Sequence, residues 1–270
     1  MAKKNAQESY QRVQEAKAKS RARSGGVRMV VSPPPPPRNV GTPSQPIHFW
    51  SPTKDIVFEG DADYSNGGLT LTKIVNSAPI GNSAGRASYS SPVRLWDAAF
   101  TTTFSFTVEP FLYKPFGDGI AFFIAPFVSE LPKKSSGGYL GLFNADTALD
   151  SYKNQIVGVE FDSFSNAWDP NTAHIGIDVN SIASVTTTPW QPGNVASATI
   201  DYEPVSTNLS VYVRYSLVSN NVNGSSSSIS FVIDLRTVLP EWVKVGFSGS
   251  TGQVVDVHRI LSWSFNSTFY

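Results

Sequence analysis

Three carboxylates, one amide and one imidazole gather in a single short segment of the chain. Glu160 and Asp162 are two positions apart in an alternating run, so both side chains project from one face of the predicted strand. Asn166 and Asp169 follow in a turn, and His174 begins the next predicted strand. Three clustered carboxylates repel each other strongly unless cations neutralise them. The segment therefore predicts a site for divalent cations.

The ligand types divide into two sets. Oxygen ligands alone suit Ca²⁺, whereas carboxylates with one imidazole suit a transition metal such as Mn²⁺ or Zn²⁺. Two divalent ions would carry four positive charges against three carboxylates, so one more acid nearby would balance them. The competing interpretation, an acidic turn with a capping His174, explains each residue singly but not the five together.

An enzyme is the main functional alternative. The Glu160-x-Asp162 pattern resembles that of jelly-roll glycoside hydrolases of the laminarinase type. Retaining hydrolysis needs a second carboxylate as general acid, and that pattern would place it at position 165, where this chain has Ser165. His48 and His258 lie in no recognisable catalytic motif. The sequence therefore favours binding over catalysis.

The elements that must hold these residues are predicted to be strands. Short runs with period-two alternation are separated by Gly, Pro, Asn, Asp and Ser, and no run has a helical period beyond a turn near Val238–Trp242. A dozen or so antiparallel strands without helices predict an all-β sandwich of two sheets. The predicted strands are Ile56–Phe58, Leu69–Ile74, Phe100–Val108, Gly119–Ala125, Ile156–Phe161, His174–Val179, Ala196–Tyr202, Leu209–Tyr215, Ile229–Leu235, Val243–Ser248 and Leu261–Phe265.

The chain divides into a basic tail, residues 1–46, and an acidic body, residues 47–270. Residues 1–48 carry nine Lys or Arg and two Asp or Glu, whereas the rest carry twelve and nineteen. Pro33–Pro37 favour an extended polyproline rod, so we expect a disordered tail. Its basic run lacks interleaved aromatics, so we expect no nucleic-acid partner. The absence of cysteine excludes disulfides and thiol chemistry.

No membrane span is expected, because the longest apolar stretch, around Ile120–Pro126, is far shorter than the ~20 residues needed. No secretory signal peptide is visible either, since the basic start is not followed by an apolar region.

Ordered sequence blocks run through nearly the whole body, from about Ile56 to Phe265. They are Val57–Ala62, Ala84–Tyr89, Asp118–Pro126, Gly137–Phe143, Val159–Asp162, His174–Ser181, Leu239–Val243 and Leu261–Phe265. These blocks resemble those of the legume lectin family.

This resemblance implies a jelly-roll β-sandwich, with one Ca²⁺ and one Mn²⁺ beside a shallow sugar site, and no catalysis. The implied Mn²⁺ ligands are Glu160, Asp162, Asp169 and His174. The implied Ca²⁺ ligands are Asp162, Asn166, Asp169 and the backbone carbonyl of Phe164. Ser184 matches a serine beside the Mn²⁺-bound water.

The same resemblance implies the sugar-binding residues. Asp118 would accept hydrogen bonds from sugar hydroxyls, while the Gly138 N–H and the Asn166 amide would donate. The Phe164 ring would face the apolar side of the pyranose, and the last loop would add N–H groups near Gln253 and Val254. In the family the peptide bond before this aspartate is cis, which here is Gly117–Asp118.

Assembly and location follow from the resemblance as well. We expect a homodimer or tetramer, although the prolines within Gly41–Ile47 make the family's first strand improbable there. Sequons at Asn208, Asn223 and Asn266 agree with a secretory, vacuolar or extracellular protein. A third functional alternative is a non-sugar-binding defence protein of the amylase-inhibitor or arcelin type. The choice among mannose, glucose and galactose stays open.

Overall fold

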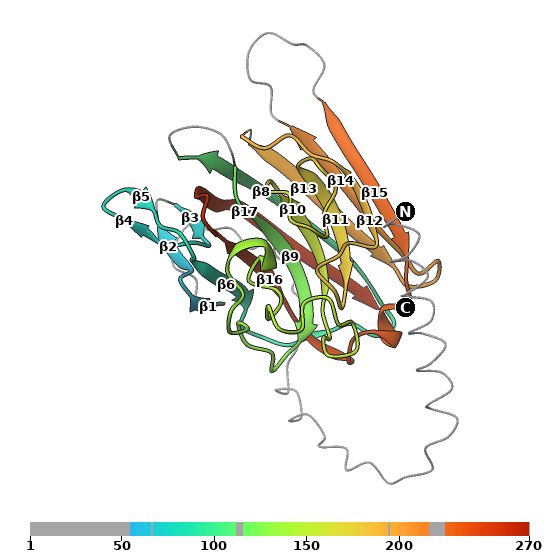
Figure 1. Cartoon of the computed structure of the whole chain (residues 1–270). Coiled ribbons are helices and arrows are strands. Elements are labelled where there is room, and N and C mark those ends of the chain that lie inside the picture. The colour runs from blue at the N-terminus through green and yellow to red at the C-terminus, as the bar shows by residue number, and fades with distance from the viewer. Residues whose placement is uncertain (1–54, 66, 112–115, 194, 216–224, 270) are drawn as a thin grey trace.

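Antiparallel strands form two large sheets and one small hairpin (Figure 1). The computed structural model describes residues 55–65, 67–111, 116–193, 195–215 and 225–269. The predicted all-β sandwich is confirmed. The basic tail, the Gly41–Ile47 segment and the Asn223 sequon lie outside the described residues.

The first large sheet carries the acidic segment. Its strand order is β1-β6-β16-β9-β10-β11-β12, and β7 also pairs with β16. Its strands are β1 (Ile56–Gly60), β6 (Ala84–Tyr89), β7 (Val93–Arg94), β9 (Gly119–Pro126), β10 (Val157–Asp162), β11 (His174–Val179), β12 (Thr186–Pro189) and β16 (Trp242–Ser250).

The second large sheet covers one face of the first, in the order β15-β14-β13-β8-β17-β3-β2. Its strands are β2 (Asp63–Ser65), β3 (Gly68–Thr70), β8 (Ala98–Pro110), β13 (Ala196–Glu203), β14 (Asn208–Tyr215), β15 (Ser226–Val232) and β17 (Asp256–Phe269). The hairpin pairs β4 (Ile74–Val75) with β5 (Ala78–Pro79), and the short 3-10 turns are η1 (Gly137–Tyr139) and η2 (Leu235–Thr237).

The main core lies between the two large sheets, where period-two alternation buries every second side chain. Phe104 of β8 meets Phe247 of β16 edge-on, with ring centroids 4.8 Å apart, and Phe247 in turn meets Trp263 of β17 at 5.0 Å. Such aromatic pairs add stability beyond the apolar area that they bury. This packing fixes how the first sheet lies on the second.

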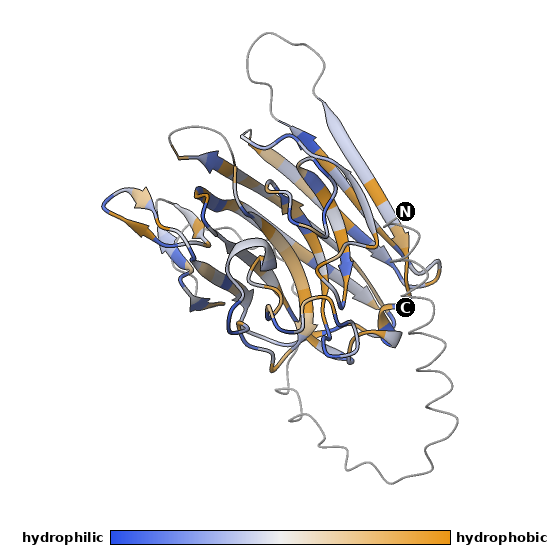
Figure 2. Cartoon of the chain, viewed as in Figure 1, coloured by the Kyte–Doolittle hydropathy of each residue, from blue (hydrophilic) through white to orange (hydrophobic). Residues whose placement is uncertain are grey.

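A second, smaller core lies on the other face of the first sheet. Ala121 and Phe123 of β9 pack there against Leu140, Leu142 and Phe143 from the long connection after β9. Strand β9 is therefore buried on both faces, and it is hydrophobic along most of its length in Figure 2. Because the acidic residues of β10 share this second face, the connections that cover it also close over them.

The structure corrects some predicted strands. The predicted Leu69–Ile74 strand divides into β3 and β4. The Leu71 N–H still bonds to the His258 carbonyl of β17, but the Lys73 N–H bonds to the Ser83 hydroxyl instead of a neighbouring strand. The predicted Ile229–Leu235 strand ends at Val232, after which Asp234 caps η2 by accepting the Arg236 N–H. Strands β6 and β12 were not predicted from alternation, since buried polar residues interrupt it in β6.

Candidate functional site

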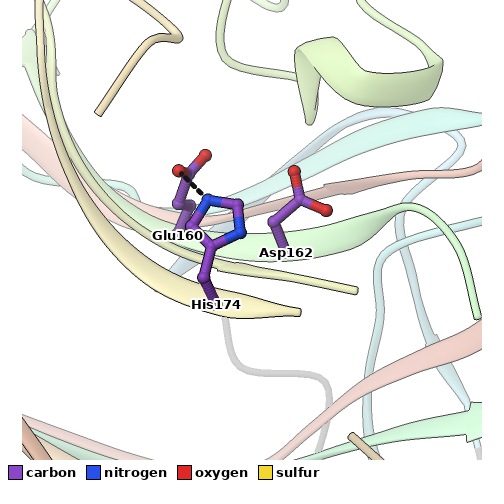
Figure 3. A group of neighbouring side chains, drawn as sticks. All are labelled: Glu160, Asp162 and His174. Carbon is purple, nitrogen blue, oxygen red and sulfur yellow. Dashed lines mark hydrogen bonds and ion pairs between the residues drawn. The ribbon is translucent and has the colours of Figure 1, made fainter. Parts of the chain in front are cut away.

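Strands β10 and β11 place three ligand-type side chains together (Figure 3). Asp162 pairs directly with His174, and Glu160 pairs with Gly176, so all project from the same face of the first sheet. Glu160, Asp162 and His174 offer ligand atoms that all lie within 4.8 Å of one another, and the three residues are buried. The His174 Nε2 atom lies 3.0 Å from the Glu160 Oε1 atom. The predicted cluster therefore exists in the fold.

The turn after β10 carries the remaining predicted ligands. Its backbone is held by the ligands themselves: Phe164 N–H donates to Asp162 Oδ1 at 2.8 Å, and Asn166 N–H donates to Asp169 Oδ2 at 2.8 Å. Asp169 Oδ1 lies 4.0 Å from His174 Nε2. The turn therefore brings Asp169 back to the face of the sheet that carries Glu160 and Asp162.

A fourth acid, Asp178, completes the cluster. Its Oδ1 atom accepts a 2.8 Å hydrogen bond from the Ser184 hydroxyl, which also bonds to Glu160 Oε1. Charge balance predicts one more acid near the three carboxylates, and Asp178 is that acid. The alternation His174, Gly176, Asp178 along β11 is the signal that could have identified it, because these residues share a face.

Gly176 makes room for this arrangement. A side chain there would collide with the Ser184 hydroxyl and the Glu160 carboxylate, both of which lie where its Cβ atom would be. Only a glycine opposite Glu160 allows that carboxylate and Ser184 to meet.

Burial and mutual repulsion raise the pKa values of the clustered acids. The pKa of Asp162 is raised well above its ordinary value by burial and by the charges of Glu160 and Asp169. Burial, then Glu160, also raises the pKa of Asp178, and that of Asp169 rises to about 7 for the same reasons. Burial opposes protonation of His174, but Glu160 and Asp169 outweigh it, so its pKa is raised. Such a cluster is poorly stabilised as anions without cations.

The oxygen atoms that face this cluster fit divalent cations. Within the described part of the chain, four buried side-chain oxygens here have no hydrogen-bond partner: Glu160 Oε2, Asp162 Oδ2, Asn166 Oδ1 and Asp178 Oδ2. Buried oxygens are costly without a partner, and a bound ion is one way to provide it. The residues present therefore fit both an oxygen-ligated ion and an ion that also takes an imidazole.

Asp118 lies beside the cluster, at the start of β9, and is 4 % exposed. Its backbone is tightly held: its N–H donates to the Ser250 carbonyl at 3.2 Å, and its carbonyl accepts from the N–H and the hydroxyl of Ser163 at 2.8 and 2.7 Å. The Gly117–Asp118 peptide bond is cis, as the family resemblance implies. Burial raises the pKa of Asp118 to about 7, although the Gly252 N–H bonded to the carboxylate acts in the opposite direction.

The other predicted sugar contacts surround Asp118. The Asn166 side chain lies directly against Gly138, so closely that no Cβ atom would fit there. Phe164 and Val254 both lie next to Gly117, whose position for a Cβ atom is 3.6 Å from Phe164 Cβ and 3.0 Å from Val254 Cβ. Asn166 therefore contacts Gly138, and Phe164 and Val254 lie beside the residue that precedes Asp118.

The last loop also places Gly252 against Asp118. The Gly252 backbone lowers the pKa of the Asp118 carboxyl group, while Gln253, one of the predicted sugar contacts, is exposed. A Cβ atom on Gly252 would lie 2.9 Å from Asp118 Oδ2, so a larger residue would crowd the carboxylate. Gly252 is not among the predicted site residues, and its signal in the sequence is a glycine two positions after Ser250 in this loop.

The segment Ser250–Gly252 connects the loops of the site. The Ser250 carbonyl accepts the Asp118 N–H, and the Thr251 carbonyl accepts the Gly137 N–H at 3.1 Å. The Ser250 hydroxyl donates back to the Gly137 carbonyl at 2.5 Å. One extended segment thus holds both the Asp118 turn and the loop that carries Gly138.

Fold and site together define a two-sheet β-sandwich with a candidate metal centre beneath its connecting loops. The model of the legume lectin domain matches residues 47–270, and the chain belongs to this family.

Relatives and solved structures agree with this assignment. The chain is 55% identical to Lectin 7 of Medicago truncatula over 249 residues, which cover 86% of this chain and 91% of that protein. Lectin I-B4 of Griffonia simplicifolia, solved in a metal-free form, is 42% identical with a TM-score of 0.75, covering 82% of this chain and 97% of that one. The lectin of Bauhinia forficata in complex with GalNAc is 40% identical with a TM-score of 0.74, covering 82% and 96%.

These relatives confirm the predicted family, the jelly-roll sandwich and the prediction of a lectin rather than an enzyme. Members of this family generally bind metal ions, which agrees with the buried cluster. Within the described part of the chain, no helix combines the length and hydropathy needed to span a bilayer.

Proposed function

We propose that this chain binds a monosaccharide unit of glycoconjugates at Asp118, without catalysis, and that divalent cations beside Asp118 prepare the site. The observation that carries the proposal is that Asn166 contacts Gly138 and Phe164 lies beside the Gly117–Asp118 bond, next to a buried four-acid cluster. The complex of the Bauhinia forficata lectin with GalNAc supports a sugar as ligand for the fold.

Each residue has a role that its chemistry supports. The Asp118 carboxylate accepts hydrogen bonds from two sugar hydroxyls, and the Gly138 N–H and the Asn166 amide donate. The Phe164 ring provides an apolar surface for the C–H groups of the pyranose. The exposed last loop, including Gln253 and Val254, borders the sugar and selects among epimers.

We assign the two ions as Mn²⁺ and Ca²⁺. Glu160, Asp162, Asp169 and His174 hold Mn²⁺, since this set includes the imidazole. Asp162, Asn166, Asp169 and the Phe164 carbonyl hold Ca²⁺, since this set offers oxygen only. Ser184 orients Glu160 through the hydrogen bond that they share. When bound, the ions neutralise the acids and fix the Asn166 side chain, which the sugar and the metal share.

Assembly and location complete the proposal. A single shallow site binds weakly, so useful avidity requires at least two sites per particle, and we propose a homodimer or tetramer. The sequons at Asn208 and Asn266, on β14 and β17, support passage through the secretory pathway to a vacuolar or extracellular location.

A glycan array read with and without cations tests the function. We expect a defined set of mannose-, glucose- or galactose-terminated glycans to bind in Ca²⁺ and Mn²⁺, and all binding to disappear after the ions are stripped. Asp118→Asn should abolish binding while the metal content is unchanged. Asp201→Asn is the matched control, because this aspartate also accepts a hydrogen bond, from Thr101 at 2.6 Å, but lies on the second sheet. An array without bound glycans in the presence of both ions would refute the function.

A further inference from the structure

Asp256 is a buried carboxyl group outside the metal cluster, and the family-derived site residues do not include it. It is 0 % exposed, and its Oδ2 atom accepts the Gly117 N–H at 2.7 Å. Its other oxygen, Oδ1, has no hydrogen-bond partner among the described residues. Burying a carboxyl group costs free energy. We therefore expect the hydrogen bond from the Gly117 N–H to Asp256 to serve the fold or the site.

The position of Asp256 in the fold suggests that reason. It is the first residue of β17, where it pairs with Pro110 at the end of β8. The last loop therefore ends at Asp256, and Asp256 lies beside Pro110, the last residue of β8. Asp256 thus connects the end of the last loop, by its Gly117 bond, to the residue before Asp118.

These contacts close a ring around Asp118. Asp256 holds the Gly117 N–H, Gly117 precedes Asp118, and Gly252 lies against the Asp118 carboxylate, with its Cβ position 2.9 Å from Asp118 Oδ2. From Gly252 the chain runs through three residues back to Asp256. If the Asp256 bond were lost, the residue before Asp118 would lose its side-chain anchor, while the Ser250 and Ser163 bonds of Asp118 itself would remain.

We propose that Asp256 is a positioning residue for the sugar acceptor: by holding the Gly117 N–H it fixes the direction of the Asp118 carboxylate relative to the last loop. This inference rests on the proposed function, because Asp118 is the acceptor there. It differs from a purely structural role, since the metal cluster is bonded independently of Asp256 through Glu160, Asp162 and Ser184.

Two substitutions separate acceptor chemistry from volume. Asp256→Asn keeps an oxygen acceptor in the same place, whereas Asp256→Leu keeps a similar size without an acceptor. For each we would measure affinity for galactose, GalNAc and methyl α-mannoside by calorimetry, bound Ca²⁺ and Mn²⁺ by elemental analysis, and amide hydrogen exchange of the peptide that contains Gly117. Asp201→Asn is again the control.

We expect Asp256→Asn to bind the best of these sugars within about threefold of the wild type, and Asp256→Leu to bind it at least about tenfold more weakly, since the lost acceptor is charge-assisted. Both variants should keep their metal ions, and the Gly117 peptide should exchange faster only in Asp256→Leu. If Asp256→Leu shows no cooperative melt, Asp256→Ala replaces it, because it adds no volume.

Three results would overturn the positioning role. The first is wild-type affinity in Asp256→Leu or Asp256→Ala, and the second is loss of metal ions together with sugar binding, which indicates a structural role. The third is unchanged hydrogen exchange of the Gly117 peptide in Asp256→Leu or Asp256→Ala. This readout remains decisive if the wild type binds none of the sugars, an outcome that would refute the proposed function separately.

Discussion

Removing the metal ions is expected to reverse how the stability of this protein depends on pH. Among the residues that the structure describes, five buried carboxyl groups have raised pKa values, and all lie in or beside the candidate site: Asp118, Asp162, Asp169, Asp178 and Asp256. In the unfolded chain these groups ionise near pH 4. Between pH 4 and about 7 the metal-free folded state therefore binds more protons than the unfolded state. Its free energy of unfolding should fall as the pH rises through this window.

One buried group acts in the opposite direction. Burial lowers the pKa of His258 to about 3, so the unfolded state binds its proton more readily between pH 3 and 6.5. This offsets at most one proton, whereas the carboxyl groups supply up to five. Counting a single net proton, because neighbouring acids titrate together, the metal-free protein loses about 1.4 kcal/mol per pH unit. From pH 5 to pH 7 that amounts to about 2.7 kcal/mol, or roughly 5–10 °C in Tm.

The metal-loaded protein should behave in the opposite way. The ions bind ionised carboxylates, so protons compete with them at pH 5 and less so at pH 7. The assay is differential scanning calorimetry at pH 5, 6 and 7, on protein dialysed free of metal and on the same protein with Ca²⁺ and Mn²⁺ restored. A metal-free Tm that stays level or rises from pH 5 to pH 7 would refute the reasoning.

Three further predictions concern single features of the chain. Asp162→Ala should remove both ions, and with them all sugar binding, because this residue belongs to both ligand sets; elemental analysis showing two bound ions would contradict this. Arg86→Met should lower the free energy of unfolding in urea by at least about 3 kcal/mol, because three buried carbonyls would lose a charged donor. Arg86 is 1 % exposed, and its guanidinium donates to the carbonyls of Gly141, Leu142 and Glu130. A loss under about 1 kcal/mol would contradict this. Deleting residues 1–46 should leave sugar affinity and dimerisation unchanged, and light scattering that finds the intact protein monomeric would overturn the proposed assembly.

The parts of the fold that follow local chemistry could be predicted from the sequence. The His174–Val179 strand was predicted with its observed bounds, because alternating apolar residues run between two turn-forming segments. Glu160 and Asp162 share a face because side chains alternate along a strand. They meet His174 because the next strand follows after a short turn and runs antiparallel beside them.

The parts that depend on distant contacts could not be predicted. Strand β6 buries Arg86 and Ser88, which hide its alternation. Arg86 is tolerated there only because carbonyls some 55 positions away accept hydrogen bonds from its guanidinium. Asp256 reaches Gly117 across 139 positions of sequence, and no local pattern marks that bond. The family resemblance identified the residues expected to touch ligand, together with Ser184, but not Gly176 or Asp256, which make room for or hold their neighbours.

The division of the last loop has a consequence for laboratory evolution. Ser250–Gly252 bond to the neighbouring loops, and Asp256 bonds to Gly117, so both ends of the loop are fixed. The three residues between them, 253–255, are at least partly exposed. A combinatorial library that varies the length and composition of this stretch alone, with both ends kept, would diversify what borders Asp118 without loosening the scaffold. Randomisation that included Gly252 would instead fill the library with variants that crowd the Asp118 carboxylate.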